Sequence, residues 1–112
     1  MSFLHEELSD GRWRNLSLAE QFANIGTEVG RTIRWKEKDQ KIFDGACDRV
    51  LELFELTLAD PRWNFFRLRE IARVRELFCY AAFFSPEYET RLEDIDRYFF
   101  QFALYAREKN RM

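Results

Sequence analysis

The chain has 112 residues, enough for one domain with a real hydrophobic core but with little surplus. Hydrophobic residues make up 46% and charged residues 34% of the chain, which is typical of a soluble globular protein and excludes a disordered one. The formal net charge of -2 argues against a surface devoted entirely to nucleic acid.

Residues 1–16 are predicted to form a partly ordered tail, although Phe3, Leu4, Leu8 and Trp13 could dock on the rest of the protein. This segment carries acidic residues and has neither a basic region nor a long apolar run, so it does not resemble a signal peptide. We therefore expect a cytoplasmic protein.

The first helix is predicted to begin at "SLAE", a capping box in which Ser17 and Glu20 satisfy each other's backbone amides. An apolar stripe at helical spacing follows, formed by Leu18, Phe22, Ile25, Val29 and Ile33. The pattern weakens in "KEKDQK" at residues 36–41, which predicts a connection. A second helix should then run to about Ala59, with an inward face of Phe43, Ala46, Val50, Leu53, Phe54 and Thr57.

The third helix is predicted to begin with Asp60 as its N-cap and Pro61 at its first position. Its core residues should be Trp63, Phe66, Ile71, Val74, Leu77, Phe78, Ala81 and Phe84. The most apolar window, residues 77–84, is far shorter than the ~20 residues of a membrane-spanning helix. We therefore expect no membrane contact.

The last helix should begin either at Ser85 and Pro86 or at a second capping box formed by Thr90 and Glu93. Its apolar seam is regular and consists of Leu92, Ile95, Phe99, Phe102 and Ala106. Four amphipathic helices with short connections predict an all-α, antiparallel up-down four-helix bundle over residues 17–110.

Two glycines, Gly26 and Gly30, lie four residues apart inside the first helix. A phosphate-binding loop would need a preceding strand and a different glycine pattern. On a helical wheel both glycines share one edge with Ala19 and Ala23, so we predict a groove of small residues into which a neighbouring helix packs closely. Each glycine costs ~1 kcal/mol relative to alanine, which close packing can offset.

Candidate catalytic groups are scarce. His5 is the only histidine, and two cysteines with one histidine match no recognised zinc spacing. Cys47 and Cys79 are most simply buried free thiols. The carboxylates of the second helix are predicted to form a solvated outer face; they are Asp44, Asp48, Glu52 and Glu55. We expect no catalytic residue, metal or cofactor, and hence no enzyme.

Nucleic-acid binding is an alternative, because residues 62–75 contain five arginines and one glutamate, interleaved with aromatic residues. Arginines bind phosphates and aromatic rings can stack on bases. The candidate contacts are Arg31, Arg34, Lys38, Arg67 and Arg69. The core pattern claims most of the rings, however, and acidic faces of a second copy could equally meet these arginines. We therefore favour a structural or interface role.

Self-association has the most direct support in the sequence. With 12 phenylalanines, the chain carries more aromatic surface than a small four-helix core can hold. The third helix has a second apolar stripe, formed by Phe65, Leu68, Ala72, Cys79 and Phe83, and the second helix is apolar over nearly half its circumference. In the last helix, Phe100 and Leu104 lie ~120° and ~160° from the seam. The predicted subunit interface comprises Phe65, Leu68, Phe83, Phe100 and Leu104; alternatively, the last two residues tuck under the tail.

Four segments carry a family resemblance: "SLAEQFANIGTEVGRTIRWKEK", "IFDGACDRVLELFELTLADPRW", "LREIARVRELF" and "RYFFQFALYAR". Over roughly residues 13–108 the chain resembles small bacterial cytosolic proteins related in fold to four-helix proteins encoded by intervening sequences in large-subunit ribosomal RNA genes. The "NIG-E-GR" segment is similar to their "NIAEG-GR" segment. The accessory proteins of diversity-generating retroelements, which bind a reverse transcriptase and nucleic acid, share this bundle.

The resemblance implies a bundle assembled into a ring, typically of five subunits. The nucleic-acid-binding relatives are markedly basic, whereas this chain is not, and no site residue is carried over. We therefore expect a homo-oligomeric scaffold that presents its surface to a protein partner; the alternative is a nucleic-acid-binding or polymerase-accessory protein.

Overall fold

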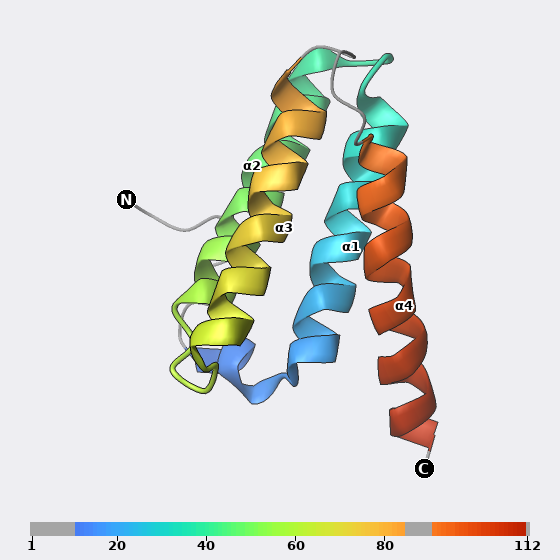
Figure 1. Cartoon of the computed structure of the whole chain (residues 1–112). Helices are drawn as coiled ribbons and strands as arrows, with labels where there is room; N and C mark the ends of the chain where they lie inside the picture. The colour runs from blue at the N-terminus through green and yellow to red at the C-terminus, as the bar shows by residue number, and fades with distance from the viewer. Residues whose placement is uncertain (1–10, 85–90, 112) are drawn as a thin grey trace.

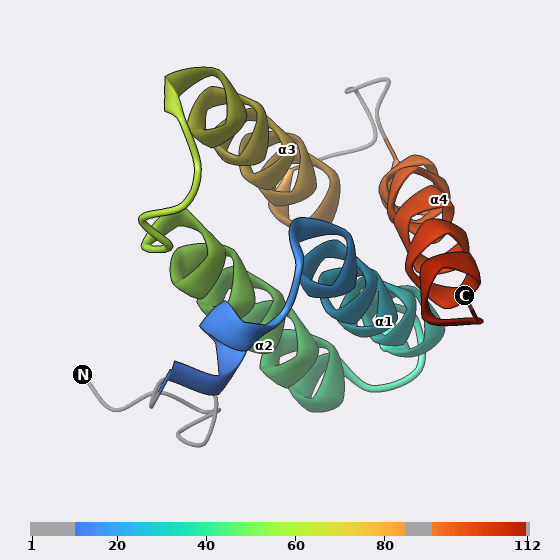
Figure 2. The same ribbon diagram turned by 90° about the horizontal axis from the view of Figure 1, so that it is seen from below.

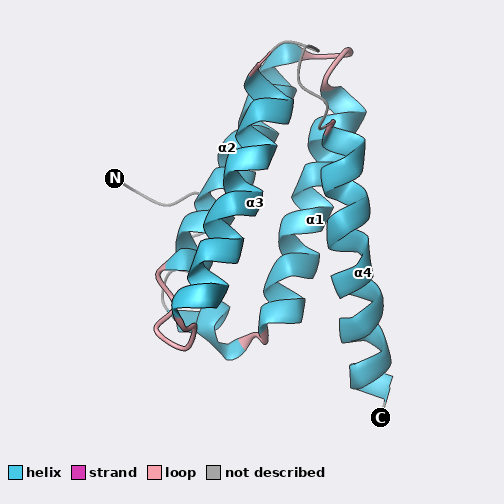
Figure 3. Ribbon diagram, viewed as in Figure 1, coloured by secondary structure: helices cyan, strands magenta, loops and turns pink. Residues whose placement is uncertain are grey.

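The computed structural model describes residues 11–84 and 91–111, and these residues form four α-helices without a strand (Figure 3). The helices are α1 (Leu18–Trp35), α2 (Gln40–Leu58), α3 (Phe65–Phe83) and α4 (Leu92–Arg111), and a short 3-10 helix, η2 (Trp13–Asn15), precedes them. Successive helices run in opposite directions along the bundle (Figure 1). The predicted all-α four-helix fold is confirmed.

The helices do not pack equally. α1 makes extensive contacts with both α2 and α4, whereas α3 contacts its neighbours α2 and α4 much less (Figure 2). A helix that makes few contacts with its neighbours leaves much of its own surface exposed to solvent. Accordingly, Phe65, Phe66 and Phe83 of α3 are exposed.

The predicted start of α1 is confirmed. The Ser17 hydroxyl accepts a hydrogen bond from the Glu20 amide, and the Glu20 carboxylate accepts one from the Ser17 amide. The next helix, α2, begins after Asp39, whose carboxylate accepts from the Ile42 amide, and it ends beside Ala59 as expected.

The predicted start of α3 is wrong. The N-cap is Asn64, whose side chain accepts from the Arg67 amide, and neither Asp60 nor Pro61 belongs to the helix. The Asp60 carboxylate is buried and bound by Arg62 and Gln21, so it is not free to cap a helix. For α4, the alternative starts at Ser85–Pro86 and Thr90 fall outside the described residues.

The core confirms most of the predicted stripes. Phe22, Ile25 and Val29 of α1 are fully buried, and the rings of Phe22 and Phe99 meet edge to face at 5.2 Å. Leu18 and Ile33 are partly buried against this core. Every predicted inward residue of α2 is buried, as are four of the five seam residues of α4: Leu92, Ile95, Phe99 and Ala106.

The prediction that Phe66 and Phe84 belong to the core is wrong, since Phe66 is 77% exposed and Phe84 is 55% exposed. Phe66 lies ~120° round the helix from the buried Phe78, at 100° per residue. Phe84 follows the last helical residue and has an extended backbone. Because α3 has few packed neighbours, rings outside its single covered face remain in solvent.

The prediction for Glu52 of α2 is also wrong. The sequence pattern predicts that it lies on a solvated face with Asp44, Asp48 and Glu55, but it is only 9% exposed. α2 packs against α1, α3 and η2, so its solvent-facing arc is narrower than a helical wheel assumes. The cysteines are free as expected; Cys47 is buried, but Cys79 is only half-buried. Burial, together with Asp44 and Asp48, raises the pKa of Cys47 to about 12.

Candidate functional site

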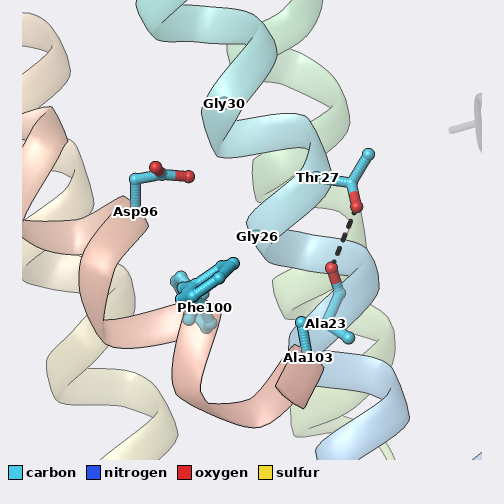
Figure 4. Close-up of a pocket in the computed structure, with 8 residues that line it drawn as sticks. Ala23, Gly26, Thr27, Gly30, Asp96, Phe100 and Ala103 are labelled. Carbon is cyan, nitrogen blue, oxygen red and sulfur yellow. Dashed lines mark hydrogen bonds between the residues drawn. The ribbon is translucent and has the colours of Figure 1, made fainter. Parts of the chain in front are cut away.

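Gly26 and Gly30 line a groove between α1 and α4 (Figure 4). It encloses about 220 Å³ and is lined by Ala23, Gly26, Thr27, Gly30, Asp96, Phe99, Phe100 and Ala103. Most of these residues are small or apolar, and Asp96 is the single charged group. A carboxylate in such a setting is poorly hydrated and favours a cationic or hydrogen-bonding partner.

The two glycines have different surroundings in this groove. A Cβ atom added at Gly26 would lie 2.7 Å from Cβ of Phe99, so α4 could not pack this closely against any other residue. A Cβ atom added at Gly30 would meet only Asp96 Oδ1, at 3.6 Å. Gly26 thus permits the close approach of α4, while Gly30 leaves open space beside Asp96. Ala23 lines the same groove, whereas Ala19 borders a neighbouring hollow beside Arg62 and Tyr105.

Asp96 is the charged residue among those that line the groove. In the part of the chain that the structure describes, no cation pairs with it and no donor hydrogen-bonds to it. Burial and the nearby Glu93 raise its pKa above the usual value for aspartate. A partner that brought a cation into the groove would relieve this unfavourable environment.

The predicted interface residues lie on two helices, α3 and α4. Phe100 is 59% exposed and lines the α1–α4 groove, with Leu104, 46% exposed, one turn further along α4. Phe65 and Phe83 are 69% and 50% exposed on α3, which does not border that groove. Leu68 is half-buried. The five residues therefore do not form one continuous surface, because Phe65 and Phe83 lie at opposite ends of α3.

The predicted basic contacts do not converge. Arg31, Arg34 and Lys38 lie at or beyond the end of α1, whereas Arg67 and Arg69 lie at the start of α3, at the opposite end of the bundle (Figure 1). Arg31 lies 3.8 Å from Glu28, and Arg67 lies 3.0 Å from Glu70. The five residues make no continuous basic stripe.

A buried polar cluster that the sequence pattern did not predict joins η2 to the bundle. Trp13 is 1% exposed and donates from Nε1 to Thr57 Oγ1 at 3.0 Å. Gln21 Nε2 donates to the Trp13 carbonyl at 2.9 Å and to Asp60 at 3.1 Å. In the sequence, the apolar character of Trp13 indicated only that this residue could dock on the bundle. The polar partners could not be identified, because they are 8 to 44 residues away from Trp13.

Asp60 is the charged member of this cluster. Arg62 donates to it at 2.6 Å and lowers its pKa to about 2, from 3.8. Because the folded-state pKa is depressed, the stability that this pair contributes is present above about pH 4 and is lost as the pH falls toward 2. The cluster anchors residues 11–16, so the predicted tail has a firmly packed end.

Within the described residues, no group of three or more His, Cys, Asp or Glu side chains is placed to hold a metal ion, and no helix is long and apolar enough to cross a membrane. His5 lies outside those residues. Comparison of the chain with protein-family models, curated proteins and solved structures finds no match.

Proposed function

We propose that this chain is a non-enzymatic scaffold that associates with copies of itself in the cytoplasm and presents the assembled surface to a protein partner. The observation that carries the proposal is the exposure of large apolar side chains on two helices: Phe65 and Phe83 on α3, and Phe100 and Leu104 on α4. Phe100 and Leu104 lie one turn apart on α4, and adjoining exposed apolar residues are typical of interaction surfaces, because leaving them in water is unfavourable. A ring of five copies is the assembly that the expected resemblance to intervening-sequence-encoded proteins implies.

Phe100 and Leu104 provide the test of self-association. We expect the wild-type protein to be an oligomer at tens of micromolar, and the Phe100→Glu/Leu104→Glu variant to be smaller, because burying two carboxylates in a contact is strongly unfavourable. Sedimentation velocity measures the size, and circular dichroism shows whether the helices are retained. Phe100 is 59% and Leu104 46% exposed in the single copy, and neither belongs to the buried core, so the fold should tolerate the change.

Gln101→Glu is the matched control, since it adds a carboxylate to an exposed polar position of α4. Its sedimentation should equal that of the wild type. A wild-type protein that is monomeric at tens of micromolar would refute the proposal. A helical double variant of unchanged size would show that Phe100 and Leu104 are not the contact.

A second candidate function, binding of single-stranded nucleic acid as a polymerase accessory, gains one specific observation. Phe65 and Phe66 are both exposed, with ring centroids 5.9 Å apart, and Arg67 and Arg69 lie within the next three residues. Exposed aromatic rings beside arginines are the elements of a base-stacking platform. The sequence pattern had assigned Phe66 to the core, so this platform argues for the second function more strongly than the pattern did.

The second function makes a measurable prediction. If these residues bind single strands, log affinity should fall with log salt by about 0.7 for each phosphate contacted. We expect no binding to generic single- or double-stranded DNA at physiological salt, because the basic residues form no continuous stripe. Fluorescence anisotropy measures the affinity. Micromolar binding that disappears in Arg67→Glu/Arg69→Glu would reverse the order of the two functions.

A further inference from the structure

The α1–α4 groove combines an apolar hollow with a carboxylate at a defined spacing. Both glycines of α1 border the groove, and on α4 the exposed ring of Phe100 lines it one helical turn after Asp96 (Figure 4). Asp96 lies beside Gly30, one helical turn further along α1. The groove is therefore complementary to an apolar side chain followed, one turn later, by a cation.

The first turns of α3 carry such a pair. Phe65 is 69% exposed, and Arg69, four residues later on the same side of the helix, is also exposed. Among the described residues, Arg69 takes part in no ion pair, unlike Arg67, which binds Glu70. The unpaired arginine on α3 and the unpaired carboxylate in the groove have opposite charges.

We propose that Phe65 and Arg69 of one copy dock in the α1–α4 groove of a second copy, with Phe65 against Phe100 and Arg69 paired with Asp96. This inference rests on the proposed self-association and names its contact. The docking pair and the groove are different surfaces of one chain, because α3 does not line the groove. Such a contact is head-to-tail, and repeated head-to-tail contacts close into a ring when the rotation permits.

Charge reversal tests the pairing directly. Arg69→Glu and Asp96→Arg should each weaken self-association about tenfold or more, since each places like charges together in the contact. Combining both substitutions in one chain should restore association, because the reversed charges again attract. Mixing the two single variants in equal amounts should restore contacts between unlike variants, although a ring of five would keep at least one contact with like charges, so we expect partial restoration. Sedimentation at several concentrations measures association, and circular dichroism checks the fold.

Two further variants guard against failure to fold. Asp96→Asn keeps the shape of the side chain and should also weaken association, because it removes the charge. Gly30→Leu should fill the groove, while the single copy has room for its Cβ atom. The matched controls are Arg14→Glu and Asp48→Arg, which make the same charge changes at exposed positions away from both the groove and the Phe65–Arg69 face of α3; both should associate like the wild type.

The outcomes separate this inference from the proposed function. A wild-type oligomer that Asp96→Arg leaves intact, or a combined variant no better than the single ones, would overturn the Phe65–Arg69 contact and leave self-association standing. A wild-type monomer would overturn both. If the chain is monomeric and binds single-stranded DNA, and Arg69→Glu abolishes that binding, this end of α3 would be assigned to nucleic acid.

Discussion

Gly26→Leu is expected to lower the thermal stability of the bundle, although leucine forms helices better than glycine. The nearest atom to an added Cβ is Cβ of Phe99, at 2.7 Å, and the Phe99 backbone carbon lies at 3.8 Å. These atoms are fixed to α4, so relief of the clash requires the helix itself to move. Overpacking of this kind typically costs ~1–3 kcal/mol, and the gain in helix propensity is only ~1 kcal/mol.

Gly30→Leu is the matched control, because its added Cβ makes only an ordinary contact with Asp96. Its melting temperature should equal or exceed that of the wild type. Melts followed by circular dichroism at low protein concentration separate the fold from self-association, which also affects apparent stability. A Gly26→Leu melting temperature at or above the wild-type value would contradict close packing at this glycine.

Trp13→Ala is expected to have the largest effect on stability of any single change in the segment before α1. The side chain is 1% exposed and belongs to the core, and truncation of a buried aromatic residue to alanine costs ~3–5 kcal/mol. Domains are typically stable by only about 5–15 kcal/mol, so much of the stability should be lost. Urea unfolding followed by circular dichroism measures the change.

Trp13→Phe and Thr57→Val separate the contribution of core packing to stability from that of the hydrogen bond between Trp13 and Thr57. Trp13→Phe keeps a ring in the core but removes the donor to Thr57, whose buried hydroxyl then lacks that partner, at a cost of ~1 kcal/mol or more beyond lost packing. Adding Thr57→Val should recover part of this loss, because both polar partners are then gone. If Trp13→Ala changes the free energy of unfolding by less than ~0.5 kcal/mol, residues 11–16 are a detachable tail after all.

Local sequence by itself determined the four helices and most of their buried faces. The capping box at Ser17 and Glu20 and the stripe through Phe22, Ile25 and Val29 depend on residues three or four apart, and such spacings are readable in one dimension. The exposed apolar positions Phe100 and Leu104 followed from the same geometry. The small-residue edge of α1 was likewise visible in the sequence.

Only the tertiary structure decided which neighbour each face meets. Asp60 follows the pattern of an N-cap, but Gln21, from 39 residues earlier in the chain, helps to bind its carboxylate, and Asn64 caps α3 instead. The predicted core of α3 included Phe66, yet the ring lies away from the covered face of α3 and remains exposed. Gly26 and Gly30 look equivalent in sequence, and only the path of α4 distinguishes them, because steric contact depends on positions in space that helical periodicity does not specify.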